Sequence, residues 1–233
     1  MIAETASGNL PIHNLLKGFA YDEIPLDVLE LLVECNNTMV QVTNNQGNLP
    51  VHIICGRYGS PSLPIVQYIV TKFPACTKVR NSLGHTPLNV AISNQYQDTV
   101  DFLLGQDQDI AVEMPTGGIS AFHRACYNGS LETIRKIHAL RPSLIETANA
   151  RNVLPLAMAI LGEQDLSTIC FLLKEHSTAL VKKDNDGFLP LHHACSVEDP
   201  DVDTIKLIFR CFPHAIHTQT NDGKLPIDRK STR

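Results

Sequence analysis

The sequence contains no tryptophan, few other aromatic residues and few charges. Aromatic residues make up 6% and charged residues 18% of the 233 residues, and the formal net charge is −5. Proteins that bind single-stranded nucleic acid stack bases on aromatic side chains, and nucleic-acid affinity comes largely from Lys and Arg that neutralise phosphates. Because both are scarce and no run of basic residues occurs, the composition argues against a nucleic-acid partner.

Long apolar runs are missing as well. No stretch approaches the roughly 20 apolar residues that cross a bilayer. The N-terminal sequence MIAETASGNLPIHNLL has neither a basic start nor a long apolar segment, so it does not resemble a secretory signal. We therefore expect no membrane partner and a cytoplasmic location, with the nucleus as the second possible compartment.

Cysteine is present, but C-x-x-C pairs are not. The seven cysteines are an odd number and are spread evenly along the chain. This pattern favours free, buried thiols in a reducing compartment over a disulfide framework. Four of the cysteines lie in or just after predicted helices and are interpreted as packing residues: Cys35, Cys76, Cys170 and Cys211.

Self-similarity, by contrast, runs through the whole sequence. A motif with a glycine, a proline and a following apolar residue recurs, for example as GNLPVHIIC, GHTPLNVAI and GFLPLHHAC. A period of 20 to 50 residues indicates a solenoid of stacked supersecondary units. The copies begin at intervals of 34 to 39 residues, at Gly8, Gly47, Gly84, Gly118, Asn152, Gly187 and Gly223.

Each copy predicts a turn followed by two short helices. The glycine suits a backbone position with positive φ, and Asn or Asp often stands three residues before it. The proline marks the start of the first helix, where its missing N–H costs nothing. In the last copy this helix is predicted to begin at Pro226. Apolar residues of the second helix pair at i and i+3: Leu29/Leu32, Val66/Ile69, Val100/Leu103, Ile134/Ile137, Ile169/Leu172 and Ile205/Ile208.

The unit G-x-L/T-P-L-H-x-A, followed by a second helix, resembles the ankyrin repeat from about Gly8 to Asp228. The resemblance implies an all-α ankyrin-repeat solenoid, which we expect to form a single domain over residues 1–233. An armadillo or HEAT array is the alternative, but it would need a longer period and no glycine turn. The incomplete last unit is interpreted either as a cap or as the edge of a fragment of a longer protein. The predicted units start near residues 5, 44, 81, 115, 149, 184 and 220.

Three His-x-x-Cys pairs are the one feature that suggests catalysis. A cysteine nucleophile needs a partly exposed setting that favours the thiolate. These cysteines occupy the position that Ile92 and Ile160 hold in other copies, which indicates an interior site. The ankyrin resemblance implies that the histidines hydrogen-bond the turn backbone between neighbouring repeats. A Cys/His-dependent enzyme is therefore a remote alternative, and no cofactor or metal is expected. The pairs are His52/Cys55, His123/Cys126 and His192/Cys195.

The resemblance implies a non-catalytic scaffold or adaptor that binds another protein on a concave face of finger turns and first helices. The alternative is a regulatory ankyrin segment of a longer enzyme or channel, and we expect a monomer in either case. Four apolar residues at the finger tips are expected to form an exposed row: Leu83, Ile119, Val153 and Phe188. The other candidate contact residues are His85, Arg57, Tyr58, Asn94, Arg124, Tyr127, Met158 and His193.

Overall fold

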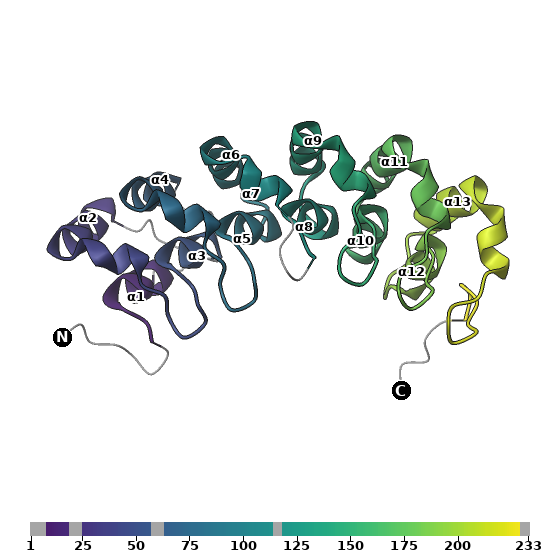
Figure 1. The fold of residues 1–233 in the computed structure, drawn as a ribbon, viewed down its shortest axis with the longest axis horizontal. Helices are drawn as coiled ribbons and strands as arrows, with labels where there is room; N and C mark the ends of the chain where they lie inside the picture. Colours follow the sequence, from purple (N-terminus) through teal and green to yellow (C-terminus); the bar gives the residue numbers. More distant parts are fainter. Residues whose placement is uncertain (1–7, 19–24, 57–62, 114–117, 229–233) are drawn as a thin grey trace. The chain divides into compact units, whose positions relative to one another are not determined.

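The computed structural model describes residues 8–18, 25–56, 63–113 and 118–228. It divides the chain into two compact units, Met1–Ala111 (unit 1) and Val112–Arg233 (unit 2), which are treated separately below. All regular elements in the described residues are helices (Figure 1), so the predicted all-α repeat class is confirmed. The single domain expected over residues 1–233 stays a prediction.

Unit 1 consists of helix pairs in two rows. The first helices contact one another in sequence, as do the neighbouring second helices α4 and α6. The finger turns extend beyond the row of first helices (Figure 1). The first helices are α1 (Pro11–Gly18), α3 (Pro50–Cys55) and α5 (Pro87–Ser93), and the second helices are α2 (Leu26–Cys35), α4 (Leu63–Lys72) and α6 (Gln97–Gln106). The short α7 (Asp109–Val112) lies at the boundary between the units.

Unit 2 repeats the same arrangement. Its central first helix, α10, contacts the first helices on both sides, and α11 contacts α13 in the second row. The first helices are α8 (Ala121–Asn128), α10 (Pro155–Leu161) and α12 (Pro190–Ser196), and the second helices are α9 (Leu131–Leu140), α11 (Leu166–Glu175) and α13 (Val202–Cys211).

Proline starts the first helix in most copies, as predicted. Pro11, Pro50, Pro87, Pro155 and Pro190 are each the first residue of their helix. Pro226 does not follow this rule, because it lies in a turn in which the N–H of Asp228 donates to the carbonyl of Leu225. The prediction of a helix beginning at Pro226 is wrong for the described residues.

Four finger turns are held by the Asn or Asp that opens them, whereas Thr220 opens the last described turn and accepts one such bond, from the N–H of Lys224. The side-chain oxygen of Asn81 accepts hydrogen bonds from the backbone N–H groups of Leu83 and His85, both at 3.0 Å. Asn44, Asn149 and Asp184 accept the equivalent pair of bonds. The glycine three residues on has positive φ, and Asn152, which replaces it once, has φ of 59°. Asn tolerates this region better than other non-glycine residues.

Neighbouring fingers are tied together by backbone and amide hydrogen bonds. In unit 1 the N–H of Ser82 donates to the carbonyl of Gln46 at 3.0 Å, and Asn81 Nδ2 donates to Asn48 Oδ1 at 2.9 Å. In unit 2 the backbone bond recurs from Asn185 to Arg151 and from Asn221 to Asp186. Through these bonds, polar groups of one turn find their hydrogen-bond partners in the next turn. Each finger therefore fixes the position of its neighbour.

A 3₁₀ helix follows most second helices, a feature that the sequence analysis did not predict. Its third residue is buried in every case, for example Cys76, Leu144 and Ala215. The signal in the sequence was a small or proline residue just after the apolar helix, as in FPAC, RPSL and FPHA. The 3₁₀ helices span Asn37–Gln41, Pro74–Lys78, Pro142–Glu146, Ser177–Val181 and Pro213–His217.

The close packing of first helices in unit 2 depends on a glycine. Gly162 caps the C-terminal end of α10 with an ordinary negative φ, so its backbone conformation does not require glycine. A Cβ at this position would overlap the backbone carbonyl of Tyr127 at the end of α8. Gln164 Nε2 also donates to this carbonyl at 3.1 Å. Only glycine therefore lets the two helix ends approach this closely.

The substitution Gly162→Ala should destabilise unit 2 by about 1–3 kcal/mol, the usual cost of forcing extra volume into a packed contact. The measurement is the free energy of unfolding in urea. Gly105→Ala is the matched control, because Gly105 is an exposed residue of α6 and a Cβ there would meet no atom within 4 Å. We expect the control to unfold at the same or a slightly higher urea concentration; equal effects of the two substitutions would contradict the close-approach explanation.

Candidate functional site

Unit 1 contains a groove in its surface. The volume of this groove is about 470 Å³. Finger turns form one side of it, and the first helices α1, α3 and α5 form the other. This cavity, called the unit 1 groove below, is lined by Leu16, Lys17, Gln46, Asn48, His52, Ile53, Gly56, Asn81, Leu83, His85, Val90 and Asn94.

Apolar side chains from two first helices line the floor of the unit 1 groove. Ile53 and Val90 are half-buried and stand at the same position of their repeats, three residues after the proline that starts the helix. Leu83, at the tip of the finger, is 77% exposed. A large apolar side chain that is exposed beside half-buried ones is typical of a binding surface.

Amide groups provide the polar positions of the groove. Asn94 Nδ2 donates to the carbonyls of Cys55 and Val90, at 3.2 and 2.9 Å. Gln46 Oε1 accepts from Asn48 Nδ2 at 3.2 Å. In the described part of the chain, Asn94 Oδ1 and Gln46 Nε2 have no hydrogen-bond partner. The groove therefore offers one acceptor and one donor to a ligand.

The predicted contact residues fall into several settings. Leu83, His85 and Asn94 line the unit 1 groove, whereas Arg57 and Tyr58 lie outside the described residues. In unit 2, Tyr127 and Ile119 are exposed, and Arg124, Met158 and Phe188 are half-buried. Met158 Sδ accepts a hydrogen bond from Asn149 Nδ2 at 3.7 Å.

The exposed apolar row that we expected at the finger tips is wrong. Val153 is only 6% exposed, and Phe188 is half-buried. The row combined two positions of the turn, because Leu83 precedes its glycine whereas Ile119, Val153 and Phe188 follow a glycine or Asn152. The residue before the glycine points into solvent at the tip, while the chain after it returns toward the helices.

His193 was expected on the exposed flank of its helix, and this expectation is also wrong. Its side chain is buried, with Nε2 3.0 Å from Asp184 Oδ2. The ring stacks on Phe188 with centroids 5.2 Å apart. Burial lowers the pKa of His193, although the Asp184 carboxylate acts in the opposite direction. Asp184, which also holds the turn, therefore has His193 as a second partner.

The sequence analysis missed the floor of the unit 1 groove. Ile53 and Val90 occupy the repeat position of Arg124, Met158 and His193, which it did select. Because they are apolar, the sequence suggested that they pack in the core. Their repeat position, which they share with the selected residues, was the signal that could have identified them as groove residues. Leu16 and Lys17, at the end of α1, were missed too.

The histidines of the repeat motif connect each first helix to the next finger. His52 Nδ1 accepts from the N–H of Leu49, and Nε2 donates to the carbonyls of Val79 and His85, both at 3.1 Å. His13 makes the same kind of bond to the carbonyl of Asn48. The role implied by the ankyrin resemblance is confirmed for these two residues.

His123 and His192 occupy the same repeat position, but the carbonyls near their Nε2 atoms are not positioned to accept a hydrogen bond. His123 interacts electrostatically with the carbonyl of Thr147, and His192 with those of Lys224 and Thr218. Neither Nε2 atom forms a hydrogen bond within the described residues. Burial lowers the pKa of both histidines.

The His-x-x-Cys pairs do not have the properties of catalytic dyads. Cys55 and Cys126 are completely buried, and this burial raises the pKa of both thiols. Cys195 is half-buried, and its thiol pKa is raised as well. A nucleophilic cysteine needs the opposite shift. In the described residues no group of three or more His, Cys, Asp or Glu could hold a metal ion.

The prediction that the remaining cysteines pack in the interior is correct only for Cys76. Cys76 is buried, and burial raises the pKa of its thiol to about 12. Cys35, Cys170 and Cys211 are exposed. They lie on the solvent faces of second helices, a position that the apolar spacing of those helices did not reveal.

Paired helices that repeat with a finger turn define a helical-repeat protein, and comparison with known proteins shows which repeats it resembles. A family model described as ankyrin repeats, in three copies, matches residues 19–114. The chain is 26% identical, over 166 residues, to the probable 26S proteasome regulatory subunit p28 of Saccharomyces cerevisiae. That alignment covers 70% of this chain and 71% of the yeast protein.

Solved structures share the fold. One match is a chain from the complex of the predatory endopeptidase Bd0816 of Bdellovibrio bacteriovorus with immunity protein Bd3460. It has a TM-score of 0.67 at 22% identity and covers 89% of this chain and 99% of its own. Another is the ankyrin repeat domain of Bcl-3, with a TM-score of 0.64, 19% identity, and 94% and 93% coverage. The chain is therefore similar to ankyrin-repeat proteins, in sequence over residues 19–114 and in fold.

No helix in the described residues is both long and apolar enough to cross a membrane.

Acidification should weaken the contact between His52 and the finger. Burial lowers the pKa of His52 from 6.5 to about 4, outweighing its bonds to the carbonyls of His85 and Val79. His52 therefore binds a proton more readily in the unfolded chain than in the folded one. Its contribution to the stability of the fold is present above pH 6.5 and is lost as the pH falls toward 4. His52→Asn copies Asn89 of the next repeat and removes the titration. We expect the free energy of unfolding in urea to differ less between wild type and variant at pH 5 than at pH 7, by about 1–2 kcal/mol. A difference that does not change with pH would contradict the lowered pKa of His52.

Thiol labelling of the native protein should separate the cysteines into two groups. We expect Cys35, Cys170 and Cys211 to react rapidly with a maleimide because they are exposed, and Cys55, Cys76 and Cys126 to react only on unfolding. Peptide mass spectrometry after timed labelling at pH 7 gives the rate at each site, and labelling in urea is the control. Rapid native labelling of Cys55 or Cys126 would contradict their burial and revive the enzymatic alternative.

Proposed function

We propose that the chain is a non-catalytic scaffold or adaptor that binds a partner protein in the unit 1 groove. The observation that carries this proposal is the combination of the half-buried Ile53 and Val90 with Leu83, which is 77% exposed at the rim. Apolar centres surrounded by polar groups dominate the energetics of protein interfaces. Here Asn94 and Gln46 provide the polar surroundings.

The rigidity of the finger turns supports the same proposal. Asn44 and Asn81 hold the two turns of the groove, and amide and backbone bonds connect them. A binding surface that is already ordered loses little conformational entropy when a partner binds. Leu83 can therefore contribute its apolar surface without an ordering cost for the turn.

The relatives point in the same direction. The yeast protein is named as a regulatory subunit of the 26S proteasome, and the Bdellovibrio structure is described as a complex of two proteins. We infer by analogy a protein partner for this chain, a monomeric state before binding, and a cytoplasmic or nuclear location. The alternative of a regulatory segment within a longer enzyme or channel would use the same groove and stays a hypothesis.

The unit 2 candidates form a second, weaker part of the proposal. Tyr127 and Ile119 are exposed, and Arg124, Met158 and Phe188 present part of their surface. Tyr and Arg are enriched among residues that dominate binding energies. We propose that these side chains add contacts to the partner, while the unit 1 groove provides the main site.

A photo-crosslinking residue at Leu83 tests the main site. We expect p-benzoylphenylalanine at this position to give discrete cross-linked proteins in a lysate of the source cells. The matched control is the same residue at Leu31, an exposed leucine on α2 of the same unit, outside the groove. Gel shift and mass spectrometry identify the products, and Val90→Asp should suppress them by changing the groove floor. Equal products from both positions, or none from Leu83, would refute the proposed site.

A further inference from the structure

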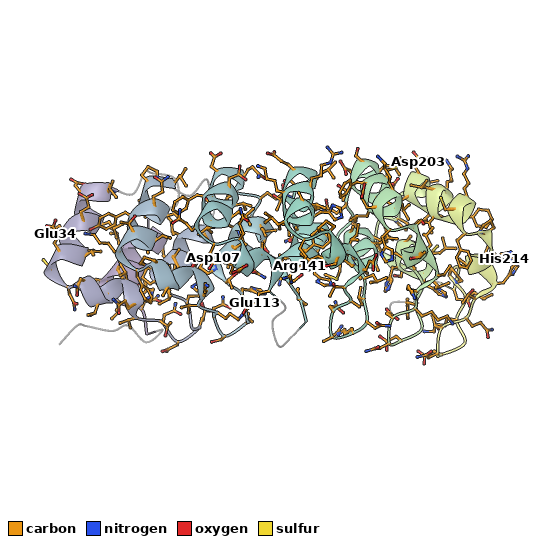
Figure 2. All side chains as sticks on the ribbon, turned by 45° about the horizontal axis from the view of Figure 1, so that its top comes forward. Glu34, Asp107, Glu113, Arg141, Asp203 and His214 are labelled. Carbon is orange, nitrogen blue, oxygen red and sulfur yellow. The ribbon has the colours of Figure 1, made fainter. Side chains whose placement is uncertain are left out.

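Charged side chains are segregated within unit 1. Its fingers and first helices (residues 8–18, 44–56 and 80–94) contain no Asp or Glu. Figure 2 shows Glu34 on the second helix α2, away from the finger turns. The carboxylates of unit 1 in the described residues all lie on or beside second helices and α7: Asp27, Glu30, Glu34, Asp98, Asp101, Asp107 and Asp109.

The groove side of unit 1 carries cations instead. Lys17 lines the unit 1 groove, and its exposed ammonium group forms no ion pair in the described residues. Arg80 opens the neighbouring finger and donates from Nη1 to the carbonyl of Gly84 at 3.1 Å. No carboxylate is found among the described lining residues, and their net charge is therefore positive through Lys17.

The repeat fold does not impose this distribution. Unit 2 uses Asp184 to hold a finger turn through the same two hydrogen bonds that Asn44 and Asn81 accept in unit 1. Asp186 and Asp222 lie in fingers of unit 2 as well. Since Asp and Asn both satisfy the turn, the neutral amides of unit 1 are not required for folding. Within the described residues, these amides place no negative charge beside Lys17.

We propose that the unit 1 groove binds an acidic segment of a partner protein that also carries a large apolar side chain. The apolar side chain packs on Ile53 and Val90, and a carboxylate of the segment pairs with Lys17. Gln46 Nε2 donates a hydrogen bond to a polar group of the segment, and Asn94 Oδ1 accepts one from it. A basic segment would instead place like charges together, which costs affinity and slows association. This inference rests on the proposed function and adds the chemistry of the partner.

Selection from an unbiased peptide library tests the charge of the ligand. A phage-displayed library of random dodecapeptides is selected on the whole protein, and bound phage are sequenced. We expect enriched peptides to have a net negative charge and at least one large apolar residue, relative to the unselected library. Their binding, measured by fluorescence anisotropy with synthetic peptides, should weaken as salt is raised from about 50 mM to about 500 mM.

Charge-reversal variants connect the selected peptides to the groove. We expect Lys17→Glu to weaken binding about tenfold. Lys72→Glu is the matched control, because Lys72 is an exposed lysine of the same unit on α4, outside the groove, and should leave affinity unchanged. Both positions are exposed, so the variants should fold, which their unfolding transitions verify. Replacing the acidic residues of a peptide by amides should reproduce the loss.

The possible outcomes separate this inference from the proposed function. Peptides that lose binding in Leu83→Asp but show no acidic bias, or that are basic, would overturn the acidic partner while leaving the groove as a binding site. Equal effects of Lys17→Glu and Lys72→Glu would overturn the role of Lys17. A selection that yields no peptide sensitive to Leu83→Asp would contradict both proposals.

Discussion

The rest of the structure depends on one interaction, the pair of hydrogen bonds that an Asn or Asp accepts at the start of four of the described fingers. The two bonds fix the turn around a residue with positive φ, as Asn81 does around Gly84. The fixed turn presents its outer backbone groups to the next finger, as between Ser82 and Gln46. A regular stack of first helices follows, because each helix begins a constant distance after its turn.

This regularity also determines which residues are left for binding. Positions that hold the turn, start the helix or fill the interior have structural partners in nearly every copy. The residue three positions after the start of the first helix varies in type, from Ile53 and Val90 to Arg124 and His193. In unit 1 this position forms the floor of a groove, whereas His193 is used to pair with Asp184. The same repeat position thus faces a groove in one copy and packs against a neighbouring side chain in another.

The histidines and cysteines of the motif show how the repeat uses reactive residue types for structure. Both ring nitrogens of His52 bond to backbone groups, which leaves none to act as a base. Cys55, three residues on, is enclosed in the interior, where burial raises its thiol pKa. A proton-transfer pair would need one of these groups to be accessible and free. Their chemistry is suppressed by the same packing that connects one repeat to the next.

The sequence by itself determined the repeat period, the helical class, the proline starts and the glycine turns, because these depend on residues close together in the chain. Tertiary structure decided which side chains reach the surface. The hydrophobicity of Val153 and Leu83 is similar, yet Val153 is buried just after Asn152, which replaces the glycine, and Leu83 is exposed just before Gly84. Likewise, Ile53 and Val90 line one groove only because neighbouring repeats bring their helices together. Burial depends on contacts between copies, and a local pattern does not specify these.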